Sequence, residues 1–383
     1  MREISVLCYD AEYRKYCSEL LTIFYLVTNI EFVEASTEFA DKDFLHVTKG
    51  TDLVEMRYTK DGQTHIFLFK DKDIEKDRIK TIKKIIFQFL NSIQQLDLPW
   101  GFLSGVRPVK MAVNLFLKGC TRQEAYRVFV NDYLVSPKKA DLLLDLAQMD
   151  LQLTGKSRVI SDSVSLYISI PFCPNRCTYC SFTSYPFDKN KDLIPVYIDC
   201  LIKELAHIQR SIQEKNQTVQ SVYIGGGTPG VLPLSLLDKL LSAVDHLCTD
   251  QTREVTFEAG RPEVFDDDKQ KCVKNHYVTR ICINPQSMDD EILRNIGRRH
   301  TVKDIVQCFD NAVKNGFDNI NTDMIVGLPG ETPDQFKKNL GLLLDLGQQS
   351  VTVHTLAMKK KAVLMQNHNA QDIVNNKDIE NSK

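Results

Sequence analysis

The pattern of apolar and polar residues differs between two parts of the chain, and it changes near residue 154. Before it, short alternating or apolar runs mix with helical patterns. These runs predict strands at residues 3–8, 30–34, 44–48, 53–59 and 64–70, and helices at 12–27, 71–93, 110–117, 121–133 and 137–149. Thr121 followed by Glu124 is typical of a helix-capping box. We therefore expect residues 1–153 to form a smaller α+β domain, to which no chemical motif assigns a role.

After a polar stretch at residues 154–163, which we interpret as a linker, short apolar strands alternate with long helices. The pattern predicts strands at 165–171, 221–224, 254–258, 280–284, 319–326 and 350–356, with helices near 192–213, 233–247, 263–274, 289–297, 301–315 and 332–346. Repeated β-then-α units form parallel sheets, so residues 164–357 are predicted to be an α/β fold, a partial (β/α)6 TIM-type barrel. Catalytic groups of such barrels lie at the C-terminal ends of the strands. The polar, Asn-rich tail at 358–383 is expected to be disordered.

Composition excludes some classes of partner. The formal net charge of the 383 residues is −2 and no basic run stands out, which argues against a nucleic-acid partner. The most apolar early stretch, residues 20–30, is too short to cross a bilayer, so we expect no membrane span. Eleven cysteines are an odd number, and a chain of this size needs no disulfides for stability. Free thiols, and hence a cytoplasmic protein, are the natural interpretation.

The strongest chemical signal is a cysteine motif directly after the first predicted barrel strand. Cys173, Cys177 and Cys180 form a C-x3-C-x2-C pattern. Three thiolates on one loop can hold three irons of a [4Fe–4S] cluster and leave the fourth iron open to a small ligand. The alternatives are a zinc knuckle or three unrelated thiols. Zinc prefers four ligands, however, and no nearby His or Cys completes a tetrahedron, since position 182 is Phe.

The residues around this motif resemble a known group of enzymes. The segment YISIPF at 167–172, followed by the three cysteines, is similar to the radical S-adenosylmethionine (SAM) superfamily, and within it to the oxygen-independent coproporphyrinogen III oxidase (dehydrogenase) family. The string from Trp100 to Phe129 and the EAGRP sequence at 258–262 resemble the HemZ-type branch, and the resemblance covers roughly residues 95–357. It implies that SAM binds the open iron and that one electron from the cluster cleaves it to a 5′-deoxyadenosyl radical.

The resemblance also carries over a set of cofactor-binding positions at the predicted strand ends. They are Tyr167, Tyr179, Gly226, Gly227, Thr228, Glu258, Gln286, Arg298 and Asp323. Most have a structural alternative: a tight turn for the glycines and Thr228, a surface salt bridge for Glu258, shielding of the cluster for Tyr179, and ordinary barrel scaffolding for Gln286, Arg298 and Asp323. His354, at the end of the last strand, is equally compatible with the site and with a buried structural role.

The implied reaction is oxidative decarboxylation of coproporphyrinogen III propionates to vinyl groups, giving protoporphyrinogen IX. A donor such as flavodoxin or ferredoxin would supply the electron. Because this substrate carries four carboxylates, cationic partners are needed. The candidates near the strand ends and in the cluster loop are Arg176, Arg261, Arg298 and Arg299.

Three features depart from the family pattern. Phe182 and Ser169 replace a Cys and a His that are common there, and the loss of the Cys also occurs in relatives that bind and deliver heme. The family extends into a C-terminal helical domain, whereas this chain ends soon after Leu356, so we expect that domain to be lacking. Two alternatives therefore stay open: a heme-binding relative that uses His300 or His354 as ligand, and an inactive truncated fragment.

Overall fold

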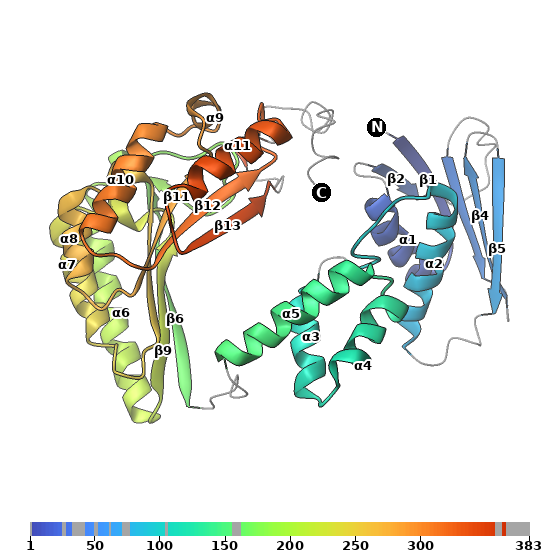
Figure 1. Ribbon diagram of the computed structural model, residues 1–383, viewed down its shortest axis with the longest axis horizontal. Helices are drawn as coiled ribbons and strands as arrows, with labels where there is room; N and C mark the ends of the chain where they lie inside the picture. The colour runs from blue at the N-terminus through green and yellow to red at the C-terminus, as the bar shows by residue number, and fades with distance from the viewer. Residues whose placement is uncertain are drawn as a thin grey trace. The chain divides into compact units, whose positions relative to one another are not determined.

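The computed structural model describes residues 2–24, 28–32, 43–49, 53–60, 63–70, 77–103, 106–154, 162–356 and 362–364. The chain divides into two compact units, Met1–Val159 and Ile160–Lys383, which we treat separately (Figure 1). Parts of some predicted elements lie outside the described residues, namely 25–27, 33–34, 71–76, the linker residues 155–161, and the tail residues 358–361 and 365–383.

The first unit begins with a five-stranded sheet in the order β2-β1-β3-β4-β5. Its strands are β1 (Arg2–Cys8), β2 (Thr28–Phe32), β3 (Asp43–Lys49), β4 (Leu53–Lys60) and β5 (Gln63–Lys70). β1 is parallel to both of its neighbours, and β3, β4 and β5 form an antiparallel meander. Helices α1 (Ala11–Phe24) and α2 (Arg78–Gln94) share one apolar core with the sheet.

A helical segment with its own core completes this unit. It contains α3 (Pro108–Leu117), α4 (Arg122–Arg127), a π-helical turn (Val128–Asp132) and α5 (Pro137–Thr154). The capping box of Thr121 and Glu124 is confirmed. The predicted linker is wrong at both of its ends, because α5 includes Thr154 and β6 begins at Ser163. Leu151 packs on the helical core, so the apolar face of α5 continues beyond the predicted end of this helix at 149.

The second unit is built on a six-stranded parallel sheet in the order β6-β9-β10-β11-β12-β13 (Figure 1). The strands are β6 (Ser163–Ile170), β9 (Thr218–Gly226), β10 (Glu254–Gly260), β11 (Arg280–Gln286), β12 (Ile320–Val326) and β13 (Ser350–Thr355). Each strand pairs with the next one along the chain, and β6 and β13 are the two edges of this sheet. The predicted partial barrel is confirmed.

One helix follows each of the first five strands of this sheet except β11, which is followed by two. These helices are α6 (Leu193–Glu214), α7 (Leu234–Asp245), α8 (Asp267–Lys274), α9 (Asp290–Asn295), α10 (Val302–Lys314) and α11 (Pro333–Leu344). Figure 1 shows α6, α7, α8 and α10 along the outer face of the sheet. Their apolar residues pack against the strands in one continuous core. The arrangement brings the C-terminal ends of all six strands to one rim.

Two further findings bear on the remaining sequence predictions. No helix in the described part of the chain is long and apolar enough to cross a bilayer. The prediction of a disordered tail is wrong for residues 362–364, where Ala362 and Leu364 are buried. The Leu364 N–H donates a hydrogen bond to the Thr178 carbonyl at 2.8 Å. The short apolar run Ala-Val-Leu interrupts the polar tail, and its burial against the cysteine loop explains the difference.

Candidate active site

The cysteine loop crosses the rim of the barrel and is tied down at several points. It follows the two-residue strand β7 (Phe172–Cys173), which pairs with β8 (Tyr185–Pro186). Thr178 donates its N–H to the Ile296 carbonyl at 3.1 Å, and the Asn175 amide donates to the Gly297 carbonyl at 2.6 Å. The loop is therefore held by the turn that follows α9.

Each of the first two motif cysteines has a hydrogen-bond donor on its sulfur. Thr228 donates its hydroxyl to Cys173 Sγ at 3.4 Å, and Arg261 Nη2 donates to Cys177 Sγ at 3.2 Å. Cys173 and Cys177 are buried, whereas Cys180 is half-buried. Burial raises the pKa of the Cys173 thiol, so a donor on the sulfur is needed to favour the thiolate form that binds metals.

A cavity of about 280 Å³ lies beside this loop at the strand ends. The three motif cysteines line it. So do eight of the nine predicted cofactor positions, which are Tyr179, Gly226, Gly227, Thr228, Glu258, Gln286, Arg298 and Asp323. The structure thus brings together residues that lie up to 150 positions apart in the chain, Cys173 and Asp323 being the most distant.

Several buried polar atoms in this cavity have no hydrogen-bond partner among the residues that the structure describes. They are Gln286 Oε1, Asn284 Oδ1 and Arg298 Nε. A buried polar group without a partner costs about 1–3 kcal/mol, so such atoms in a cavity are suited to a polar ligand. Gln286 also has a φ of 73°, a strained value for a residue other than glycine that is found preferentially at functional sites.

The acidic side of the cavity is formed by Glu258 and Asp323. Glu258 accepts hydrogen bonds from Asn284 Nδ2 at 3.0 Å and from the Tyr223 hydroxyl at 3.3 Å. Burial, and secondarily the charge of Asp323, raise the pKa of Glu258 to about 7. Asp323 Oδ2 lies 3.8 Å from His354 Nε2. This pair of carboxyl groups suits a ligand that carries a positive charge.

Comparisons with known proteins agree with this geometry. The family description "Radical SAM superfamily" matches residues 167–343. The oxygen-independent coproporphyrinogen-III oxidase-like protein HemZ of Bacillus subtilis is 31% identical over 345 residues, which cover 87% of this chain and 67% of HemZ. The chain belongs to the radical SAM superfamily, among the HemZ-like proteins.

Other relatives match a smaller share of this radical SAM protein. The heme chaperone HemW of Lactococcus lactis is 32% identical over 207 residues, covering 52% of this chain and 51% of HemW. The solved structure of coproporphyrinogen III oxidase (HemN) from Escherichia coli superposes with a TM-score of 0.50 at 23% identity, over 59% of this chain and 51% of that one. This structure supports the fold alone. The chain spans about half the length of these two relatives.

The predicted cofactors of this radical SAM protein, a [4Fe–4S] cluster and SAM, are confirmed by its superfamily.

The spacing of the three motif thiols fits a cluster better than a single metal ion. Thiolates on one zinc ion, with Zn–S bonds of about 2.3 Å, lie roughly 3.8 Å apart. Among the described residues, the three sulfur atoms are not all within 4.8 Å of one another. Wider spacing is expected when each thiolate binds a different iron, and the unpartnered polar atoms nearby fit a polar ligand such as SAM.

Tyr167 is the predicted cofactor position that the structure does not place in the cavity. It lies beside Tyr223 in the strand register, three residues before Ile170 pairs with Gly226 at the rim. Its ring stacks on that of Tyr223 at 5.7 Å, and 64% of the residue is exposed. At about 3.3 Å per residue, Tyr167 lies roughly 10 Å below the rim.

The arginines predicted to bind substrate carboxylates have different roles in the structure. Arg261 and Arg298 line the cavity but are buried, and Arg298 donates to the Asn284 carbonyl and the Tyr179 hydroxyl. Arg261 donates to both the side chain and the carbonyl of Asn175, as well as to Cys177. These two guanidiniums therefore hold the site together. Arg176 lines the cavity, whereas Arg299 is exposed and outside its lining.

The two candidate heme-ligand histidines differ in burial and in location. His300 is buried, with Nδ1 2.7 Å from Glu263 Oε2, which argues against its use as an exposed axial ligand. His354 lines the cavity and is more than half exposed. Sequence reasoning missed Asn175, Tyr223 and Asn284. Asn284 lies on the same strand as Gln286, so its position near the strand end was the available signal.

The raised pKa of Glu258 predicts a pH-dependent stability. The folded-state pKa of Glu258, about 7, exceeds its ordinary value of 4.5. The folded state therefore holds this proton more tightly than the unfolded state does. The resulting contribution to folding stability is fully present below pH 4.5 and is lost as pH rises through 7. The loss amounts to about 3 kcal/mol above pH 8. We expect cofactor-free Glu258→Gln to be more stable than the wild type at pH 8, by up to this amount, and nearly equal to it at pH 5. Urea unfolding at both pH values checks this, and a difference that does not vary with pH would contradict it.

Proposed function

We propose that this protein catalyses the oxygen-independent oxidative decarboxylation of coproporphyrinogen III, converting propionates to vinyl groups and giving protoporphyrinogen IX. The observation that carries the proposal is the convergence of the cysteine loop and the strand-end polar residues on one cavity. The choice of substrate rests on HemZ, whose similarity covers 87% of the chain and so extends beyond the barrel unit. The HemW similarity covers 52%.

In this proposal the protein's residues position and shield the reacting groups. Cys173, Cys177 and Cys180 hold the cluster, while Glu258 and Gln286 orient SAM. The bound cofactors supply one-electron chemistry that removes a hydrogen atom from the substrate. Each propionate then loses carbon dioxide and one further electron, so one SAM is consumed per vinyl group and an electron acceptor is required. A flavodoxin or ferredoxin in a reducing cytosol is the proposed donor, in agreement with the free cysteines.

Two residues of the cavity lining suit a substrate that carries pyrrole rings and carboxylates. Phe182 lines the cavity, and 65% of it is exposed. An exposed aromatic ring can pack on one pyrrole ring of the porphyrinogen, whose rings are joined by methylene bridges. Arg176, in the same lining, provides a planar cation for a propionate.

Anaerobic turnover tests the proposal. The protein is reconstituted with iron and sulfide and mixed with SAM, a reductant and coproporphyrinogen III, and the products are analysed by mass spectrometry. We expect 5′-deoxyadenosine together with a substrate mass that is lower by two decarboxylations, and neither product from Cys177→Ala. Formation of 5′-deoxyadenosine without a change in substrate mass would reject this substrate. Absence of both products, although the cluster has formed, would reject the enzyme.

Heme binding and delivery is the second candidate function. It is favoured by the HemW relatives and by His354, an exposed histidine that lines the cavity. Titration with heme separates the two functions. A Soret band that shifts on binding and is lost in His354→Ala, in a protein that does not decarboxylate coproporphyrinogen, would establish the heme-binding role.

A further inference from the structure

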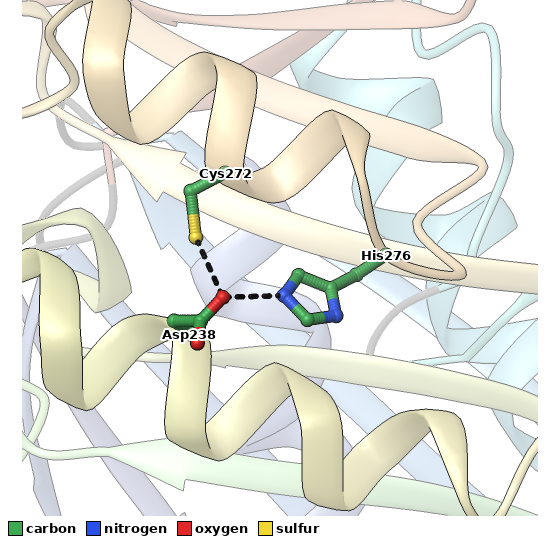
Figure 2. Close-up of side chains that lie close together, drawn as sticks. All are labelled: Asp238, Cys272 and His276. Carbon is green, nitrogen blue, oxygen red and sulfur yellow. Dashed lines mark hydrogen bonds and ion pairs between the residues drawn. The ribbon is translucent and has the colours of Figure 1, made fainter.

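A second group of metal-ligating side chains lies between two outer helices of the barrel unit. Asp238 is on α7, Cys272 is on α8, and His276 follows two residues after the end of α8. Figure 2 shows their side chains directed toward one another. None of the three lines the cavity described above. The group therefore has no part in the proposed reaction site.

The spacing of the ligand atoms suits one small cation. His276 Nε2 lies 3.1 Å from Asp238 Oδ1, and Cys272 Sγ lies 3.7 Å from the same oxygen. All three ligand atoms are within 4.8 Å of one another. Bonds of about 2.0–2.3 Å around a tetrahedral zinc ion place ligand atoms roughly 3.3–3.7 Å apart. The two distances to Asp238 Oδ1 are therefore close to the edge lengths of such a tetrahedron, and the helices need no rearrangement.

The histidine is oriented as metal-binding histidines are. Its Nδ1 lies 2.7 Å from Asp245 Oδ2, and Asp245 Oδ1 accepts the Tyr277 N–H at 2.9 Å, which fixes this carboxylate. A carboxylate on one ring nitrogen places the proton there and directs the lone pair of the other nitrogen toward the metal. Here that other nitrogen faces a second carboxylate, that of Asp238. A neutral imidazole can donate to only one of them, so the second contact needs either a ring proton or a cation.

The exposure of the ligand side chains leaves room for a water ligand. The His276 side chain is only 10% exposed, whereas that of Asp238 is 63% exposed. The site is thus packed on the histidine side and open on the aspartate side, where solvent can supply a fourth ligand. Thiolate, imidazole and carboxylate together favour zinc over magnesium or calcium, which prefer oxygen ligands alone.

We propose that Asp238, Cys272 and His276 bind one zinc-class divalent ion, with Asp245 as the carboxylate that orients His276. Because the ligands are 34 and 38 residues apart in sequence, the ion would fasten α7 to α8 on the outside of the barrel. Its expected effect is on stability, which makes the test independent of the proposed reaction.

Two measurements test this site. In the cluster-loaded wild-type protein, where the cluster occupies the motif cysteines, elemental analysis after dialysis against zinc is expected to find one zinc per chain. The full chain with Cys173, Cys177 and Cys180 replaced by alanine is then titrated with Co²⁺. We expect the near-ultraviolet absorption of a thiolate–Co²⁺ bond, which disappears on Cys272→Ser and persists on Cys200→Ser, a substitution of an exposed cysteine on α6.

Further variants separate metal binding from folding. Asp245→Asn removes the orienting carboxylate without removing a ligand, and we expect its zinc affinity to fall by about tenfold or more. Asp238→Asn changes a largely exposed side chain, so the protein should stay folded while its affinity for zinc falls. The proposal is overturned if the cluster-loaded protein retains no zinc, or if Asp238→Asn and Cys272→Ser bind zinc as the wild type does. In the first case His276 would be held by a ring proton alone.

Discussion

Replacing Arg261 with leucine is expected to remove most of the iron–sulfur cluster from the protein. The Arg261 side chain is only 3% exposed, and its guanidinium donates to Asn175 and to Cys177 Sγ. Leucine can fill much of the space but donates no hydrogen bond. The Asn175 carbonyl would then be left without this donor, and Cys177 Sγ would lose the hydrogen bond that Arg261 donates.

The expected loss of iron in Arg261→Leu follows from the free-energy cost of breaking a buried charged network. Removing one partner of such a network costs about 3–5 kcal/mol, which is a factor of more than 100 in the population of the ordered loop. We therefore expect the iron and acid-labile sulfide per chain, after reconstitution and gel filtration, to fall by about tenfold or more. Circular dichroism would show whether the rest of the barrel stays folded.

Two neighbouring substitutions make this experiment specific. Arg299→Leu removes an exposed guanidinium outside the cavity lining, and it should leave the iron content unchanged. Arg261→Lys keeps the charge, but one ammonium lacks the planar fork that reaches Asn175 and Cys177 together, so an intermediate loss is expected. Wild-type iron content in Arg261→Leu would show that this guanidinium does not hold the loop.

The strand-end residues that the structure brings to one cavity are close together for one physical reason. The strands of the barrel alternate with helices at a spacing that is visible in the apolar pattern, and parallel strands end at the same rim. Gly226, Glu258, Gln286 and Asp323 each lie at or near a predicted strand end, and all four line the cavity. Their convergence could be predicted from periodicity and the motif order, without knowledge of any contact.

The contacts that hold the site could not be predicted in this way. Arg261 reaches Cys177 across 84 residues of sequence, and from the chain alone it resembled a cation available to substrate. Tyr167 belongs to a conspicuous motif, yet its position three residues before the rim depends on the strand register. The group of Asp238, Cys272 and His276 joins two helices whose sequences show no common metal-binding motif. Such contacts depend on how elements pack, which local periodicity does not encode.

Gly227→Ala is the second change for which we expect a large effect, and its cause is purely steric. A Cβ on Gly227 would lie 2.7 Å from the Phe172 carbonyl oxygen, 2.9 Å from that of Ile170 and 3.0 Å from Cys173 Sγ. Two of these atoms belong to the backbone and cannot rotate away. The Gly227 N–H donates to Ile170 O and the Thr228 N–H donates to Phe172 O, both at 2.8 Å, so separating the two segments would break these bonds.

The clash lies at the first cluster ligand, so we expect its effect on the cofactor to exceed its effect on the fold. Overpacking costs about 1–3 kcal/mol, a moderate loss for a barrel of this size, but the displacement of Cys173 should lower the iron content severalfold and abolish 5′-deoxyadenosine formation. Gly341→Ala is the matched control, because no described residue outside its own helix lies within 4 Å of the added Cβ and the position is inside α11. Alanine is favoured over glycine there by about 0.5–1 kcal/mol, so this variant should melt slightly higher and keep its cluster. If Gly227→Ala bound iron as Gly341→Ala does, the close approach of Gly227 to Cys173 would have no role in holding the cluster.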